Sequence, residues 1–122
     1  MELDKISEKI IGCAIEVHRT IGPGLLESVY ESALCIELES AGVQIERQKQ
    51  LPVFYKGIAI GDFRVDLVVE GLVIVELKRV ERFDPVVEAQ ILSYMRLGSY
   101  KLGLLINFNS RLLKDGVKRF IL

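Results

Sequence analysis

The chain has 122 residues, of which 50% are hydrophobic and 27% are charged, as in one ordinary globular domain. No apolar run approaches the roughly 20 residues that span a bilayer, and the N-terminal segment lacks the pattern of a secretion signal. The net charge of −1 argues against a strong non-specific nucleic-acid binder. We therefore expect a single cytoplasmic domain, residues 1–122, with no membrane contact.

Two helices are predicted in the first third of the chain. Apolar residues recur at three- and four-residue spacing from Leu3 to Ile21, which predicts an amphipathic helix. The Gly-Pro-Gly segment 22–24 ends this helix, and a second is expected from about Leu25 to Ala41, before Gly42. The second helix is expected to turn five apolar side chains inward: Leu26, Val29, Ala33, Leu34 and Leu38.

Two short strands are predicted after the helices. Val43 to Arg47 alternate between apolar and polar residues, and Leu51 to Tyr55 form a second strand before a turn at Lys56-Gly57. Proline cannot donate a hydrogen bond to a neighbouring strand, so Pro52 should place its strand at a sheet edge or at an irregular position.

A hairpin of buried strands is predicted from Asp62 to Lys78, where two β-branched runs flank Glu70-Gly71. Its register depends on the turn. A two-residue turn would pair Val69 with Leu72, whereas a three-residue connection with a left-handed glycine pairs Val69 with Val73. We predict the three-residue connection, or an equivalent bulge.

This register sets Asp66 opposite Glu76, and side chains two apart on a strand share a face, so Lys78 joins them. Their neighbours are expected to form an apolar face for the core: Val65, Leu67, Val75 and Leu77. Opposed carboxylates repel by about 0.2–1 kcal/mol, so a cation should lie between them. One interpretation is a solvated ion-pair ladder made with Lys78 and Arg64. The other is Mg²⁺ or Mn²⁺, which carboxylate oxygens suit and which leave positions for phosphate oxygens.

The remainder of the chain contains one more helix and one more buried strand. Pro85 opens a helix through about Leu97, on which Gln90 and Tyr94 share a face because they are four apart. Lys101 to Phe108 reads as a buried strand, and Val117 to Leu122 as a terminal strand or helix.

Three motifs resemble known nucleases. Asp66 followed by Glu-x-Lys at Glu76 and Lys78 resembles the PD-(D/E)xK nuclease superfamily. The segment from Gly24 to Tyr30 resembles the Gly-x-x-Glu-x-x-Tyr signature of the GxxExxY proteins, and the segment from Gln90 to Tyr94 resembles the Gln-x-x-x-Tyr element of RecB-type nucleases. The resemblance covers nearly the whole chain.

The resemblance implies an α/β, restriction-endonuclease-like three-layer core, in which helices flank a mixed β-sheet with a central hairpin. It implies a metal site for Mg²⁺ or Mn²⁺ held by Glu27, Asp66, Glu76 and the Leu77 carbonyl. It also implies a catalytic set, Asp66, Glu76 and Lys78, and a nucleic-acid-binding or supporting set, Gln90, Tyr94 and Tyr30. Without the resemblance, Glu27 would complement a helix N-terminus, and Gln90 and Tyr94 would cover the sheet.

The function expected from these motifs is metal-dependent hydrolysis of phosphodiester bonds in DNA or RNA, with DNA favoured. The alternative is a non-catalytic, nuclease-like module that binds nucleic acid or a protein. A purely structural interaction protein would instead keep these charges screened by solvent and bind no metal. A domain of this size would need a partner or a homodimer to surround a duplex.

Overall fold

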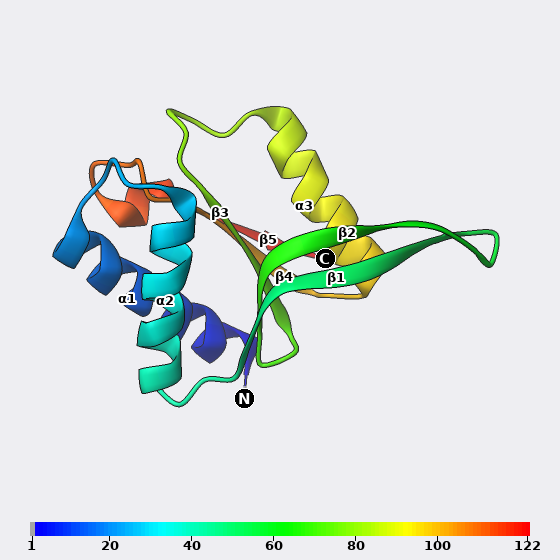
Figure 1. The fold of residues 1–122 in the computed structure, drawn as a ribbon, viewed down its shortest axis with the longest axis horizontal. Coiled ribbons are helices and arrows are strands. Elements are labelled where there is room, and N and C mark those ends of the chain that lie inside the picture. The colour runs from blue at the N-terminus through cyan, green and yellow to red at the C-terminus, as the bar shows by residue number, and fades with distance from the viewer. Residues whose placement is uncertain (1) are drawn as a thin grey trace.

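The computed structural model describes residues 2–122 as one five-stranded sheet with helices on both faces (Figure 1). The elements in chain order are α1 (Leu3–Ile21), α2 (Glu27–Ser40), β1 (Ile45–Tyr55), β2 (Ile58–Val69), β3 (Val73–Lys78), α3 (Pro85–Gly98), β4 (Leu102–Asn107), the 3-10 helix η1 (Leu113–Gly116) and β5 (Val117–Ile121). Within these residues, β3 and β4 pair in parallel and the other neighbours pair antiparallel. A parallel pair needs a long crossover, which α3 supplies. The expected α/β fold with a mixed sheet and a central hairpin is confirmed.

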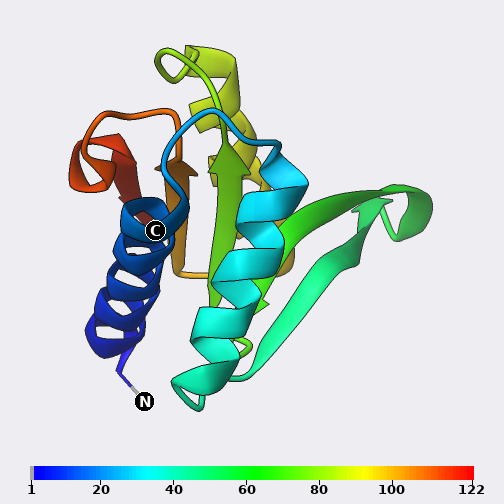
Figure 2. The same cartoon turned by 60° about the vertical axis from the view of Figure 1, so that its left-hand side comes forward.

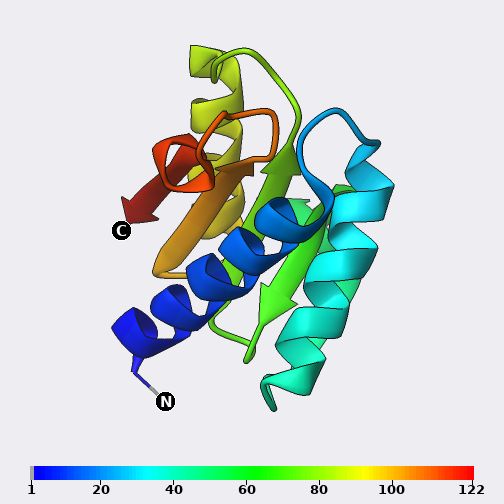
Figure 3. The ribbon, with the colours of Figure 1, turned by 90° about the vertical axis from the view of Figure 1, so that its left-hand side faces the viewer.

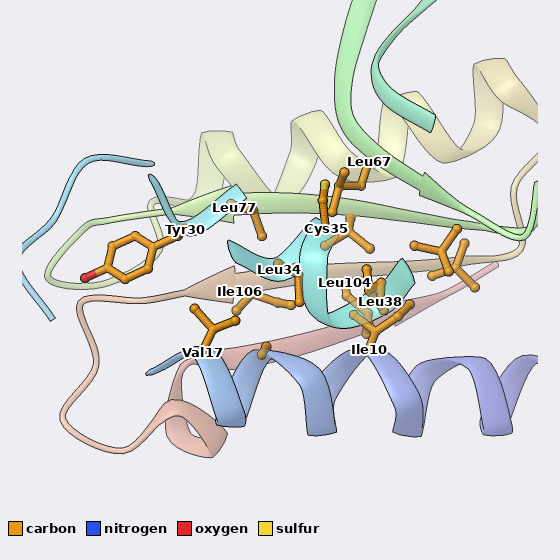
Figure 4. Close-up of a cluster of buried hydrophobic side chains, with 14 of the residues drawn as sticks. Ile10, Val17, Tyr30, Leu34, Cys35, Leu38, Leu67, Leu77, Leu104 and Ile106 are labelled. Carbon is orange, nitrogen blue, oxygen red and sulfur yellow. The ribbon is translucent and has the colours of Figure 1, made fainter. Parts of the chain in front are cut away.

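The helices form two outer layers around the sheet. Figure 2 and Figure 3 show α1 and α2 side by side on one face and α3 on the other. What we call the helix-pair core lies between α1, α2 and the sheet and includes Ile10, Val17, Leu34, Leu38, Leu67, Leu77, Leu104 and Ile106 (Figure 4). The α3 core lies on the opposite face and includes Phe63, Val65, Val68, Ile74, Ile91, Met95 and Leu105. Within residues 2–122, no helix is both long and apolar enough to cross a membrane.

Helix α1 spans the predicted residues, but α2 is rotated from the predicted orientation. Leu26 precedes the helix and is 65% exposed, and Val29 is also exposed, so the prediction that they face inward is wrong. Tyr30 takes the inward position, where its ring is fully buried and stacks on Phe108 at 4.4 Å between centroids. Burying this large ring turns four side chains of α2 toward the core: Tyr30, Leu34, Cys35 and Leu38.

Strand β1 is continuous, whereas the sequence predicted two strands. Gln48 has a left-handed backbone (φ 50°), yet Arg47 pairs with Leu67 and Lys49 with Val65, so no residue is inserted into the register. The polar Gln-Lys-Gln run therefore interrupts the hydrophobic pattern without ending the strand. β1 is an edge strand, as Pro52 predicted.

The β1–β2 ribbon changes layers at Gln48 and Asp66. Before this point, Ile45 and Leu67 pack into the helix-pair core; beyond it, side chains of the same parity pack into the α3 core: Leu51, Val53, Phe63 and Val65. The prediction that Val65 shares a face with Leu67 is therefore wrong, because the ribbon rotates between them. Asp66 lies at this crossing, between Val65, which packs into the α3 core, and Leu67, which packs into the helix-pair core.

The connection between β2 and β3 confirms the predicted three-residue loop. Val69 pairs with Val73, and Glu70 and Gly71 both have left-handed backbones, with φ of 54° and 67°. Glycine adopts this conformation without steric cost. The register is therefore the one that sets Asp66 opposite Glu76.

Candidate active site

The candidate site lies where strands β2 and β3 separate. Their ladder ends at Leu67 and Val75. Beyond it, the Asp66 N–H donates to Glu76 Oε1 at 3.0 Å, and the Leu77 N–H donates to Asp66 Oδ2 at 2.8 Å. Each carboxylate thus accepts a hydrogen bond from a backbone N–H of the opposite strand, in place of the backbone carbonyl that would accept it in a regular ladder. This exchange fixes both side chains, and it leaves further oxygen lone pairs on each.

The two carboxyl groups are disfavoured as a pair of anions. Burial raises the pKa of Glu76 to about 8, and the Asp66 charge adds to the shift. Burial also raises the pKa of Asp66, although the hydrogen bonds from the Leu77 N–H and from Gln48 act in the opposite direction. A proton or a bound cation relieves this repulsion.

Lys78 is half-buried two residues after Glu76, and its charge lowers the pKa of both carboxyl groups. Among residues 2–122, neither Lys78 nor Arg64 forms an ion pair. The described chain therefore lacks the ion-pair ladder that would have made these residues an ordinary charged surface.

A pocket of about 140 Å³ opens beside Asp66 on the α2 side. It is lined by Glu27, Ser28, Glu31, Gln48, Asp66 and Leu77. Two of the expected metal-binding residues, Glu27 and Leu77, therefore lie next to Asp66, and the Glu27 charge also contributes to the raised pKa of Glu76. Across residues 2–122, however, no three carboxylate, histidine or cysteine side chains are close enough to hold one ion by themselves.

Glu31 and Gln48 belong to this site but were not predicted from the sequence. Glu31 is 8% exposed and accepts hydrogen bonds from Gln48 Nε2 at 2.6 Å and from Arg47 Nη2 at 2.9 Å. Gln48 Nε2 also donates to Asp66 Oδ1 at 3.2 Å. The spacing of Glu27 and Glu31, four apart on one helix, was a usable signal for Glu31. No comparable signal pointed to Gln48, whose left-handed backbone conformation is a tertiary feature.

Tyr30 supports the segment that leads into Glu27. Its hydroxyl donates to the Gly22 carbonyl at 2.6 Å and accepts from the Leu25 N–H at 3.1 Å. Arg79 Nη1 donates to the Leu25 carbonyl at 2.6 Å. Tyr30 therefore contacts the loop before Glu27 through its hydroxyl.

Tyr94 lies on the α3 side of the carboxylates. Its ring stacks on Phe63 at 4.2 Å between centroids. Burial raises the pKa of its hydroxyl, and the charges of Glu76 and Asp66 raise it further. Gln90 is exposed one turn earlier, and its hydrogen bond to Tyr94 has the opposite effect on that pKa. The predicted pair therefore shares one face beside the site.

The oxygen donors of this site fit Mg²⁺ or Mn²⁺. Mg²⁺ keeps several waters and is commonly held by one or two carboxylates together with phosphate oxygens, so it does not need a complete protein cage. Asp66 and Glu76 supply two hard oxygen donors whose repulsion a cation would relieve. Neither carboxylate is neutralised by an ion pair among residues 2–122.

Comparison with known protein families gave a match over most of the chain. A family model described as the PD-(D/E)XK nuclease superfamily matches residues 4–120, nearly the whole chain. Searches of curated proteins and of solved structures gave no match.

Proposed function

Because the chain belongs to the PD-(D/E)XK nuclease superfamily, we propose that it is a metal-dependent nuclease that hydrolyses phosphodiester bonds, with DNA preferred to RNA. The observation that carries this proposal is the reciprocal bonding of Asp66 and Glu76 to the backbone of the opposite strand. It fixes two repelling carboxylates side by side. A purely structural role would not need that repulsion.

Asp66 and Glu76 would hold Mg²⁺ or Mn²⁺, with Glu27 and the Leu77 carbonyl completing the protein's share of the donors. When bound, the ion would polarise the scissile phosphate and lower the pKa of a coordinated water. Because the protein donors are few, phosphate oxygens of the nucleic acid would complete the coordination. Substrate binding and metal binding would therefore reinforce each other.

Lys78 would act on the attacking water or on the phosphate. Its ammonium group is compact, and its half-buried position beside the carboxylates lets it orient that water, take its proton, or stabilise negative charge at the phosphate. Gln90 and Tyr94 would orient Lys78 or the nucleic-acid backbone from the α3 side. Tyr30 would act indirectly, by holding the loop before Glu27.

A non-catalytic module that binds nucleic acid or a protein is the second candidate. The observation that favours it is that no three ligating side chains within residues 2–122 converge on one point. Such a module would bind nucleic acid equally well with and without Asp66 and Glu76.

A cleavage screen over plasmid, linear duplex, single-stranded DNA and RNA tests the proposal. We expect the wild type to cut at least one substrate with Mg²⁺ or Mn²⁺, and Asp66→Asn, Glu76→Gln and Lys78→Ala to abolish cleavage while remaining folded. Matched controls are Glu8→Gln on α1 and Lys114→Ala on η1, two exposed positions that should cut normally. Cleavage retained by all three site variants would contradict the assignment.

A further inference from the structure

The β1–β2 hairpin extends beyond the body of the domain as an arm. We define the arm as residues 49–65, the part of the ribbon beyond the crossing at Gln48 and Asp66. Its base packs on α3, whereas its tip projects away from every other element (Figure 1, Figure 2). Residues 54–60 at the tip are all exposed. A projecting two-stranded ribbon has few contacts to stabilise it, so an unused arm would be a liability.

The tip of the arm is apolar on both faces. Four large apolar side chains are between 58% and 67% exposed: Phe54, Tyr55, Ile58 and Ile60. Tyr55 pairs with Ile58, and Phe54 pairs with Ala59, so neighbouring pairs point to opposite faces. Clustered exposed apolar groups mark interaction sites. Because both faces are apolar, docking one face against a flat partner would leave the other in water, whereas insertion into a groove would cover both.

The arm is basic within an otherwise acidic molecule. It contains three cations and one anion, Lys49, Lys56, Arg64 and Asp62, for a net charge of +2. The whole chain carries −1, so the remaining residues carry −3. Among residues 2–122, Lys56 and Arg64 form no ion pair, whereas Lys49 pairs with Glu46 at 2.9 Å. This charge favours a polyanionic partner over a second copy of the arm, which would repel the first.

The base of the arm belongs to the candidate active site. Asp66 follows its last residue, and Phe63 stacks on Tyr94. The eight residue-to-residue steps from Asp66 to Ile58 span about 26 Å at roughly 3.3 Å per step. DNA rises about 3.4 Å per step along one strand, so the tip can reach about eight steps from a phosphate held at the site.

We propose that the arm binds duplex DNA by lying in a groove, with the apolar tip against the bases and the lysines near phosphates. A two-stranded ribbon fits the major groove of B-form DNA, which is about 12 Å wide, whereas the deep, narrow major groove of A-form RNA excludes it. This inference rests on the proposed function for its choice of nucleic acid, and it names double-stranded DNA as the substrate class.

The test measures binding of a fluorescent 20-base-pair duplex to the full chain by anisotropy, in EDTA, so that no cleavage occurs. Ile58→Ser should weaken binding at least about fivefold, since an apolar contact to the bases is lost. Its control is Ile36→Ser on α2, a position with the same 67% exposure outside the arm. Lys56→Ala should weaken binding and reduce the slope of log K against log salt by about 1. Its control is Lys5→Ala on α1, which should change neither the affinity nor the slope.

Three results would overturn the proposal. One is wild-type affinity in both Ile58→Ser and Lys56→Ala. Another is a wild-type dimer by sedimentation that Ile58→Ser converts to a monomer with unchanged duplex affinity, which would make the arm a self-association surface. The third is no duplex binding by the wild type. In that case, metal-dependent cleavage of single-stranded DNA would still support the proposed nuclease function. Conversely, duplex binding that depends on the arm, without cleavage of any substrate, would support the DNA-binding role of the arm but not the nuclease function.

Discussion

Glu76 should make the stability of the metal-free protein depend on pH. Its folded pKa of about 8 lies above the ordinary value of 4.5, so the native state binds more protons than the unfolded state between these values. The free energy of unfolding should therefore fall as pH rises from about 5 to 8. Glu76→Gln removes this titration and should flatten the profile. Urea denaturation at several pH values in EDTA measures it, and equal slopes for Glu76→Gln, wild type and Glu8→Gln would contradict the assignment.

Gln48 should be a positioning residue whose replacement by glycine separates function from stability. Glycine relaxes the left-handed backbone (φ 50°), so the free energy of unfolding should be unchanged or higher. The variant also loses the hydrogen bonds to Glu31 and Asp66, so the affinity for Mn²⁺ should fall about tenfold or more.

The loss in Gln48→Gly should grow as the pH is lowered, because the Gln48 hydrogen bond lowers the pKa of Asp66 and so helps to keep it ionised. Glu70→Gly is the matched control, since Glu70 also has a left-handed backbone (φ 54°) but lies in the loop between β2 and β3. An equal loss of metal affinity in both variants would show that backbone relaxation, not the Gln48 side chain, is responsible.

At the residue scale, the sequence predicted the residues whose placement follows from local geometry. The alternation of β3 and the three-residue loop were enough to bring Asp66 and Glu76 together. Glu31 and Gln48 were missed because their roles depend on the rotation of α2 and on one left-handed residue within a strand. Neither feature leaves a periodic signal in the sequence.

At the scale of elements, the absence of a side chain at Gly103 on β4 lets α3 pack closely on the sheet. A Cβ at this position would lie 2.8 Å from Met95 Sδ and 3.2 Å from Ile91 Cδ1. Gly103→Ala should therefore cost about 1–3 kcal/mol and reduce cleavage by displacing α3 and its Tyr94. Gly12→Ala on α1 is the control. It meets no atom within 4 Å and should stabilise the helix by about 0.5–1 kcal/mol.

Urea denaturation of Gly103→Ala and Gly12→Ala gives the sign of each change, and cleavage assays show whether α3 matters to the site. If Gly103→Ala were as stable as the wild type, the close packing of α3 on β4 would not be a constraint on the fold.

Element boundaries were predictable where one periodicity dominated. Helix α1 and the β2–β3 loop follow directly from the apolar spacing and from Gly71. The rotation of α2 was not predictable, because it depends on stacking between Tyr30 and Phe108, which are far apart in the sequence. The crossing of the β1–β2 ribbon was not predictable either, since alternation of side chains persists on both sides of it.

For the whole molecule, the order of helices and strands predicted an α/β domain with a mixed sheet covered by helices, whereas the three-layer arrangement was implied by the family resemblance. The structure shows that α3 is the crossover that the parallel pair β3–β4 requires. The near-neutral net charge concealed a basic arm, since opposite charges elsewhere in the chain cancel it. Charge location depends on the fold, so composition alone could not indicate where a polyanion would bind.

Calorimetric titration of Mn²⁺ and Mg²⁺ into the wild type, Asp66→Asn and Glu76→Ala tests the central claim most directly. We expect saturable binding to the wild type that disappears in both variants, since each removes one of the two opposed carboxylates. Glu8→Gln should bind as the wild type does. Absence of binding by the wild type, or equal heats from the wild type and both site variants, would contradict a metal site at Asp66 and Glu76.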